Sequence, residues 1–105
     1  MRGIRSGFVD HPKGVAVDEQ QVFVCSSVDH CVSVFSKASG AFVRKIGSKG
    51  SGQGQLFDPY DICLDGNNVY VCERANHPAR VQVLTKEGVR PVHWLCKWGW
   101  ANHFS

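Results

Sequence analysis

Hydrophobic residues alternate with polar ones in a series of short runs along the chain. Each run is rich in β-branched or aromatic residues and is bounded by Gly, Asp, Asn or Ser. This pattern is typical of β-strands, and no segment shows the sustained 3.6-residue apolar period that predicts a helix. The predicted strands are residues 15–17, 22–24, 32–35, 42–46, 62–64, 69–71 and 81–84. The sequence therefore predicts an all-β fold.

The pattern of the first half of the chain recurs in the second half. Residues 12–25 align without a gap on residues 59–72, at an offset of 47. The identical pairs are Pro12/Pro59, Asp18/Asp65, Val22/Val69, Val24/Val71 and Cys25/Cys72. After a two-residue insertion at 78–79, the match continues between residues 31–37 and 80–86. Four short strands in about 45 residues are typical of one β-propeller blade, so we predict two blades.

The repeat resembles the NHL repeat of β-propeller proteins. The resemblance is carried by Pro-Lys-Gly-Val-Ala-Val-Asp at 12–18, Arg-Val-Gln-Val-Leu at 80–84 and the Gly-rich stretch 47–56. It covers about residues 8–88 and implies two four-stranded antiparallel blades of an NHL-type β-propeller. In the second copy, Glu73 and Arg80 match the family's acidic residue and arginine. Ser26 and Cys31 replace them in the first copy, which therefore lacks a buried polar link.

The repeat boundaries divide the chain into a first blade (1–47), a Gly-rich interblade linker (48–58), a second blade (59–90) and an aromatic tail (91–105). After Gly88 the pattern decays, and Pro91 is unfavourable in a central strand. Either a fourth strand with a small insertion follows, or the repeat stops near residue 90. Propellers close with about four to eight blades. We therefore expect an incomplete, unclosed propeller, either a fragment or an obligate partner of further blades, that can self-associate through its open blade edges.

Composition and cysteine usage exclude some functional classes. The hydrophobic fraction of 43%, the charged fraction of 20% and the net charge of +3 are ordinary for a globular protein. No apolar run approaches the roughly 20 residues of a membrane span, and the N-terminus does not resemble a secretory signal. A cytoplasmic location is predicted. The odd count of five cysteines, without a C-x-x-C pair, favours reduced structural thiols. Cys25, Cys63 and Cys72 fall in predicted strands, where a free cysteine behaves as a small buried hydrophobe.

His30 and His77 occupy equivalent repeat positions, so they should lie on the same rim of adjacent blades. The NHL resemblance includes a peptidylglycine-amidating lyase that binds metal through histidines, which makes a lyase-like enzyme one alternative. Zinc needs three or four converging ligands, and a turn between strands explains both histidines more simply. No nucleophilic or paired-carboxylate constellation occurs, and Asp18 and Asp65 are assigned to turns. We therefore predict no cofactor and no enzyme activity.

Basic residues near the end of the first copy offer another candidate site. Arg44, Lys45 and Lys49 lie close in sequence to Phe42 and Phe57, an arrangement that can bind single-stranded RNA by charge and stacking. Arg80 is a further candidate binding residue. The alternative is a solvated outer strand and loop, which the modest net charge favours. The preferred function is a protein-interaction scaffold that presents blade rims and loops to a protein partner, as the propellers of tripartite-motif proteins do.

Overall fold

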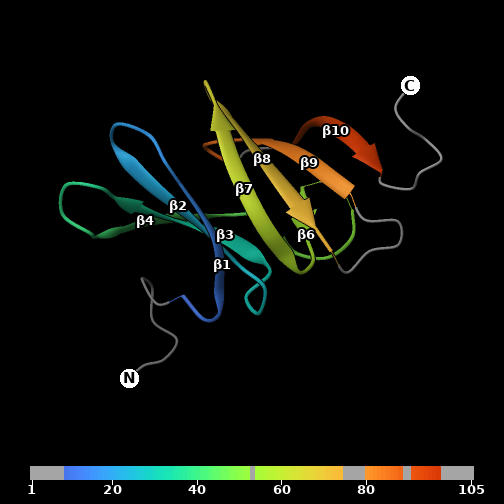
Figure 1. Ribbon diagram of the computed structural model, residues 1–105, viewed down its shortest axis with the longest axis horizontal. Helices are drawn as coiled ribbons and strands as arrows, with labels where there is room; N and C mark the ends of the chain where they lie inside the picture. The colour runs from blue at the N-terminus through green and yellow to red at the C-terminus, as the bar shows by residue number, and fades with distance from the viewer. Residues whose placement is uncertain (1–8, 53, 75–79, 89–90, 98–105) are drawn as a thin grey trace.

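The computed structural model describes residues 9–52, 54–74, 80–88 and 91–97, the last range by its backbone alone (Figure 1). The described residues form two four-stranded antiparallel sheets and a short parallel ladder. The first sheet has the order β1 (Pro12–Val17), β2 (Gln21–Ser26), β3 (Cys31–Ser36) and β4 (Phe42–Ile46). The second has the order β7 (Pro59–Asp65), β8 (Asn68–Glu73), β9 (Arg80–Thr85) and β10 (Pro91–Lys97). The all-β prediction is confirmed, and no described segment is a helix long and apolar enough to cross a membrane.

Local hydrogen bonds and backbone freedom explain the tight turns between strands. Asp18 Oδ1 accepts the backbone N–H groups of Gln20 at 2.8 Å and Gln21 at 2.7 Å, which turns the chain from β1 into β2. Between β7 and β8, Gly66 adopts a φ of +59°, as two-residue hairpin turns require. The assignment of Asp18 to a turn is therefore confirmed.

The segment after Gly88 contains the fourth strand of the second sheet. β10 pairs antiparallel with β9, and its register shifts between Pro91 and His93 and again between Trp94 and Cys96. Such shifts are how a sheet accommodates extra residues in one strand. Of the two alternatives that the sequence left open, a fourth strand with inserted residues is the one observed. The first blade therefore comprises β1–β4, and the second comprises β7–β10.

The linker between the blades carries a small ladder of its own. β5 (Ser48–Lys49) and β6 (Gln55–Leu56) pair in parallel within the predicted linker 48–58. A Cβ atom added at Gly47, whose φ is +85°, would lie 2.9 Å from Leu56 Cδ1. Glycine thus lets the chain turn out of the first blade while Leu56 enters the core.

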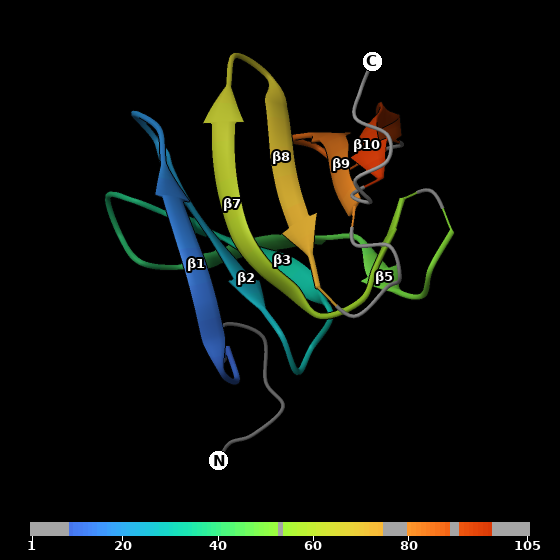
Figure 2. The same cartoon turned by 45° about the vertical axis from the view of Figure 1, so that its right-hand side comes forward.

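The two blades stack against each other with their inner strands β1 and β7 side by side (Figure 2). Gly14 and Asp61 hold the same position in the repeat, and a Cβ atom on Gly14 would lie 3.1 Å from Asp61 Cα. Side chains of both blades and of the linker form one core, made of Phe23, Cys25, Val32, Val34, Ile46, Leu56, Ile62, Val69, Val71 and Leu84. The core therefore depends on the stacking of two blades, because each blade covers an apolar face of the other that would otherwise be exposed to water.

An ion pair joins the two blades at the end where β1 turns into β2. Lys86 Nζ lies 2.8 Å from Asp18 Oδ2. The hydrogen bond from Lys86, followed by those from the Gln20 and Gln21 amides, lowers the pKa of Asp18 from 3.8 to about 2. The stabilisation from the charged carboxylate is therefore present above pH 4 and is lost as the pH falls towards 2.

Replacement of Asp18 by asparagine should make the free energy of unfolding depend less on pH under acidic conditions. The Asp18→Asn variant keeps the Oδ1 acceptor for the turn amides but carries no charge for Lys86 to bind. We expect the free energy of unfolding in urea to fall less steeply between pH 4 and pH 2 than in the wild type. Glu19→Gln, which neutralises an exposed carboxylate on the same turn, is the matched control. Equal pH slopes for Asp18→Asn and the wild type would contradict the assignment.

Candidate functional site on the rim of the blades

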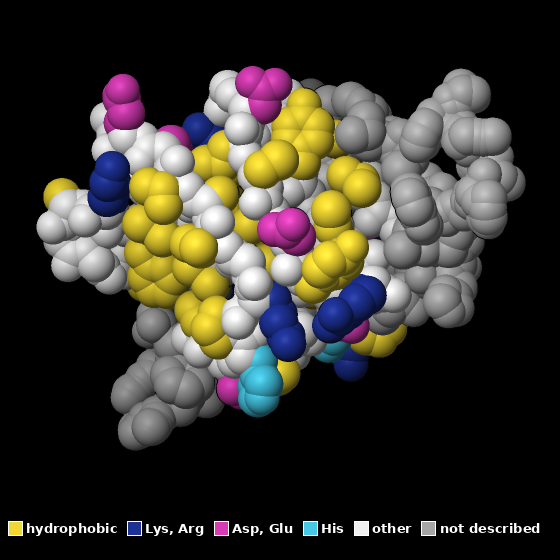
Figure 3. Space-filling model, in the orientation of Figure 1, with side chains coloured by type: hydrophobic (Ala, Val, Ile, Leu, Met, Phe, Trp, Pro, Cys, Tyr) yellow, Lys and Arg dark blue, Asp and Glu magenta, His cyan; other side chains and the backbone are white. Residues whose placement is uncertain are grey.

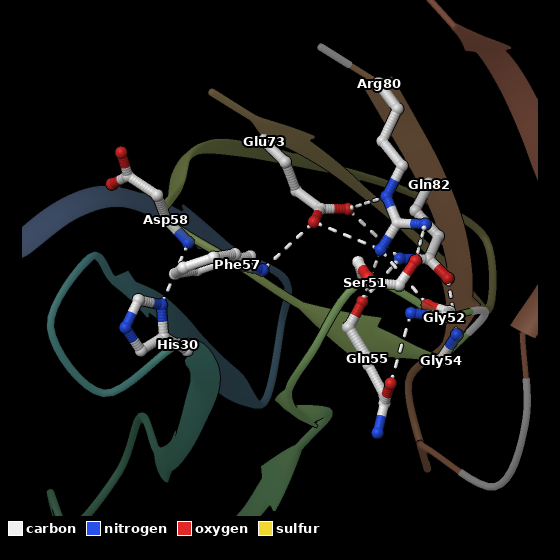
Figure 4. Close-up of polar contacts among 10 residues, drawn as sticks. All are labelled: His30, Ser51, Gly52, Gly54, Gln55, Phe57, Asp58, Glu73, Arg80 and Gln82. Carbon is white, nitrogen blue, oxygen red and sulfur yellow. Dashed lines mark hydrogen bonds and ion pairs between the residues drawn. The ribbon is translucent and has the colours of Figure 1, made fainter. Parts of the chain in front are cut away.

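A buried polar cluster lies where the linker enters the second blade. Arg80 Nε lies 2.6 Å from Glu73 Oε2, and the two side chains are 2% and 0% exposed (Figure 4). Gln82 Nε2 also donates to Glu73 Oε2 at 3.1 Å. The residues come together because Glu73 and Arg80 are direct partners across β8 and β9, and Gln82 lies two positions further along the same face. The ion pair that the repeat resemblance implied for the second copy is therefore present.

This cluster holds the linker by its backbone. Arg80 donates to the carbonyl oxygens of Ser51 at 2.9 Å, Gly52 at 3.1 Å and Gln55 at 2.7 Å. Glu73 Oε1 accepts the Phe57 N–H at 3.0 Å. Gln82 Nε2 donates to the same Gln55 carbonyl at 3.0 Å, and Gln82 Oε1 accepts the N–H of Gly54. These hydrogen bonds fix the backbone of the linker, which has little regular secondary structure of its own.

The position of Arg80 changes its expected role. The sequence analysis treats Arg80 as a candidate binding residue. In the structure its guanidinium is buried, where it contacts the Glu73 carboxylate and backbone carbonyl groups of the linker. Its register opposite Glu73 places it inside the blade, not on the solvent side. Arg80 is a structural residue that positions the linker.

Small groups replace this cluster in the first blade. Ser26 and Cys31 hold the positions of Glu73 and Arg80, and both are buried. Ser26 Oγ accepts the N–H of Asp29 at 2.9 Å and donates to the carbonyl oxygen of Asp10. Ser26 satisfies local turn groups in place of the missing ion pair.

The rim above this cluster is formed by the β2–β3 turn and by the end of the linker. His30 Nδ1 accepts the backbone N–H of Asp58 at 2.9 Å (Figure 4), and its ring packs edge-on against Phe57 with centroids 4.8 Å apart. His30 and Asp58 have φ angles of +56° and +54°, in the left-handed region that His and Asp adopt more readily than most other non-glycine residues. The hydrogen bond between these two residues joins the β2–β3 turn to the end of the linker.

The same geometry defines what His30 can do chemically. Because Nδ1 accepts an amide hydrogen, the ring carries its own proton on Nε2 in this arrangement. Among the described residues, no three His, Cys, Asp or Glu side chains gather closely enough to hold a metal ion. His77, its predicted companion, lies outside the described residues. The described contacts give His30 a structural role in the turn.

The exposed part of the rim presents two adjacent pairs of an aromatic ring and a cation. Arg74 Cζ lies 5.0 Å from the centroid of Tyr60, which is 38% exposed, and Lys49 Nζ lies 5.8 Å from that of Phe57. Asp58, which follows Phe57 in the sequence, forms an ion pair with Arg74, with 3.6 Å between Asp58 Oδ2 and Arg74 Nε. Asp58 therefore connects the two pairs. We call Lys49, Phe57, Asp58, Tyr60 and Arg74 the rim surface. Figure 3 shows that Lys, Arg and His side chains lie along the lower edge of the molecule in this view.

The basic residues singled out in the sequence do not form one surface. Arg44 lies between the blades, where its Nη2 donates to the Lys86 carbonyl at 2.6 Å and to Gln21 Oε1 at 3.2 Å. Lys45 is exposed on the opposite face of β4, because successive residues of a strand point to opposite sides. Lys49 lies on β5, in the linker. Arg44 is therefore engaged within the protein and does not share an exposed surface with Lys45, which weakens the support for the RNA-binding hypothesis.

The four cysteines whose side chains the structure describes lie on both faces of the blades. Burial raises the pKa of the Cys25 thiol to about 11 and also raises that of Cys31, so both stay protonated and unreactive. Cys63 is exposed, not buried. It lies on the side of the second blade that faces away from the first, and the alternation pattern alone does not distinguish the two sides.

Comparison with known proteins places these observations in context. A family model described as a 6-bladed β-propeller matches residues 8–77. Among solved structures, the chain is similar to the hydrazine synthase of Kuenenia stuttgartiensis, with 21% sequence identity and a TM-score of 0.63. The match covers 84% of this chain but only 25% of that one, so it shows the fold alone. A comparison with curated proteins gives no match.

Proposed function

The chain belongs to the 6-bladed β-propeller family, and from this premise we propose that it is a non-catalytic module that binds a protein partner at the rim surface. The observation that carries the proposal is the exposed Tyr60 ring with Arg74 5.0 Å from its centroid. Tyrosine and arginine are the residue types most enriched at the energetic centres of protein interfaces. Propellers offer such sites on the loops at the ends of their blades, where function concentrates.

Rigid support beneath the rim favours this proposal. The backbone of Phe57 is held by Glu73, and the backbone of Asp58 by His30. Preorganised side chains lose less conformational entropy when a partner binds. The backbone that carries Phe57 and Asp58 is therefore already in position before a partner binds.

We also propose that the two repeats are of the NHL type. The buried pair of Glu73 and Arg80 supports this assignment, since it occurs at the two positions that the resemblance specified. The linker of residues 47–56 passes between the blades where the resemblance expects a crossing. Within such a propeller, the rim surface lies at the junction of adjacent repeats.

Partner binding should depend on the rim surface and not on the opposite end of the blades. We expect the Tyr60→Ala/Arg74→Ala variant to lose about 30-fold or more in affinity for a protein captured by the wild-type chain, since interface hot spots contribute about 2 kcal/mol or more. Titration calorimetry with the captured protein measures the loss. The double variant Glu19→Ala/Lys37→Ala changes two exposed charged residues outside the rim surface and should bind like the wild type.

Two results would contradict the proposal. One is unchanged affinity of the Tyr60→Ala/Arg74→Ala variant for every captured protein. The other is tight binding of single-stranded RNA that weakens steeply with added salt, the signature of phosphate contacts.

A further inference from the structure

The end of the linker is held between the two blades by the backbone of one residue, Asp58. Its carbonyl oxygen accepts the backbone N–H of Arg74, which follows β8, at 3.2 Å. Its own N–H donates to His30 Nδ1, on the β2–β3 turn of the first blade, at 2.9 Å (Figure 4). Among the described residues, no other hydrogen bond joins this turn to the linker. The contact between the first blade and the end of the linker therefore depends on His30.

This hydrogen bond can form in one direction only. A backbone N–H group is a donor, so His30 Nδ1 must supply a lone pair, and a ring nitrogen has a free lone pair only in the neutral imidazole. The protonated ring carries a hydrogen on both nitrogens. Its Nδ1–H group would then face the N–H group of Asp58, and two donors cannot form a hydrogen bond. Protonation of His30 in this position therefore removes the bond.

Charged groups of both signs lie on the elements around the His30 ring. They are Asp10 and Asp29 beside the β2–β3 turn, Asp58 and Lys49 on the linker, and Glu73 and Arg74 at the end of β8. Carboxylates attract a proton to a neighbouring ring and cations repel it, but neither restores an acceptor on Nδ1 once the ring is protonated. His30 is half-buried, so protons from the solvent can reach it.

We propose that His30 is a pH-sensitive switch, which holds the end of the linker to the first blade when neutral and releases it when protonated. Imidazole is the side chain that commonly changes its charge between about pH 5 and pH 8. The attachments to the second blade involve no imidazole, since Glu73 accepts the Phe57 N–H and Asp58 accepts the Arg74 N–H. Release is therefore confined to the side of the first blade. Phe57 and Asp58 belong to the rim surface, so the switch sets how firmly this surface is held, whatever it binds.

Amide hydrogen exchange followed by nuclear magnetic resonance at pH 7.5 and pH 5 tests the switch in the unmodified chain. The protection factor, which corrects for the intrinsic effect of pH on exchange, should fall about fivefold for the Asp58 amide, as expected for the loss of one hydrogen bond. The Phe57 amide, which Glu73 holds, should keep its protection factor. Equal protection of Asp58 at both pH values would overturn the proposal. A parallel loss at Phe57 would do so too, because it would indicate a general loosening of the fold.

The variants His30→Asn and His11→Asn separate His30 from the exposed His11. Asparagine readily adopts the left-handed conformation of both positions, whose φ angles are +56° and +53°. Its Oδ1 atom occupies the same place along the side chain as Nδ1 of histidine and does not titrate. The protection factor of Asp58 should therefore be independent of pH in His30→Asn and should keep the wild-type dependence in His11→Asn. A dependence that persists in His30→Asn, or one that disappears in His11→Asn, would contradict the assignment to His30.

Discussion

Replacement of Arg80 by alanine should lower the free energy of unfolding by about 3–5 kcal/mol, the cost of leaving one partner of a buried ion pair without its counter-charge. Glu73 is fully buried, and its carboxylate lies 2.6 Å from the arginine nitrogen that the substitution removes. The same change removes three hydrogen bonds to linker carbonyl groups. Chemical denaturation of the Arg80→Ala variant and the wild type measures the difference.

Arg74→Ala is the matched control, because Arg74 is also an arginine paired with a carboxylate. Its side chain is 54% exposed and lies 3.6 Å from Asp58, and exposed pairs contribute about 0–1 kcal/mol. The Glu73→Leu/Arg80→Met double variant should be more stable than Arg80→Ala, since it leaves no buried charge. Similar losses for Arg80→Ala and Arg74→Ala would contradict the buried cluster.

Truncation of Phe23 to alanine should cost about 3–5 kcal/mol, as expected for a large aromatic side chain removed from a packed core. The Phe23 ring is fully buried in the core that both blades share. Lys86 of the second blade places its ammonium group 5.8 Å from the ring centroid. The loss would therefore weaken the stack of blades as well as the first sheet. Thermal and urea unfolding should both show the change.

A surface truncation separates this effect from a general sensitivity of the first blade. Val28, on the β2–β3 turn, is 45% exposed, and Val28→Ala should change the free energy of unfolding by no more than about 0.5 kcal/mol. If Phe23→Ala cost as little as Val28→Ala, the ring would not lie between packed blades.

The strands and their repetition could be predicted from the sequence because both leave a periodic signal. Apolar alternation marked seven of the eight strands of the two large sheets, and β4 (Phe42–Ile46) has the predicted bounds. The offset of 47 residues that relates Gly14 to Asp61 in the sequence also brings them together in space. The sequence does not decide whether β10 forms, because the repeat pattern decays after Gly88 and Pro91 is unfavourable in a central strand. The register shifts of β10 explain why the alternation is interrupted there.

The candidate site could not be predicted in the same way, because it depends on which face of a blade meets its neighbour. Arg44 and Lys45 are adjacent in sequence but lie on opposite faces of β4, and only the stacking of the blades decides that Arg44 is enclosed. Tyr60 and Arg74 come together from β7 and from the end of β8, a proximity that no local motif records. Their only sequence signal was the position of each beside a repeat landmark, Pro59 and Glu73.

The central claim is that equivalent positions of the two repeats lie side by side across the inner strands. A nuclear Overhauser spectrum tests it through one cross-peak, between an α-proton of Gly14 and the α-proton of Asp61. The account predicts this cross-peak, since a Cβ atom on Gly14 would approach within 3.1 Å of Asp61 Cα. Its absence from a spectrum that does contain the cross-strand peaks between β1 and β2 would show that the blades form but do not stack in this way.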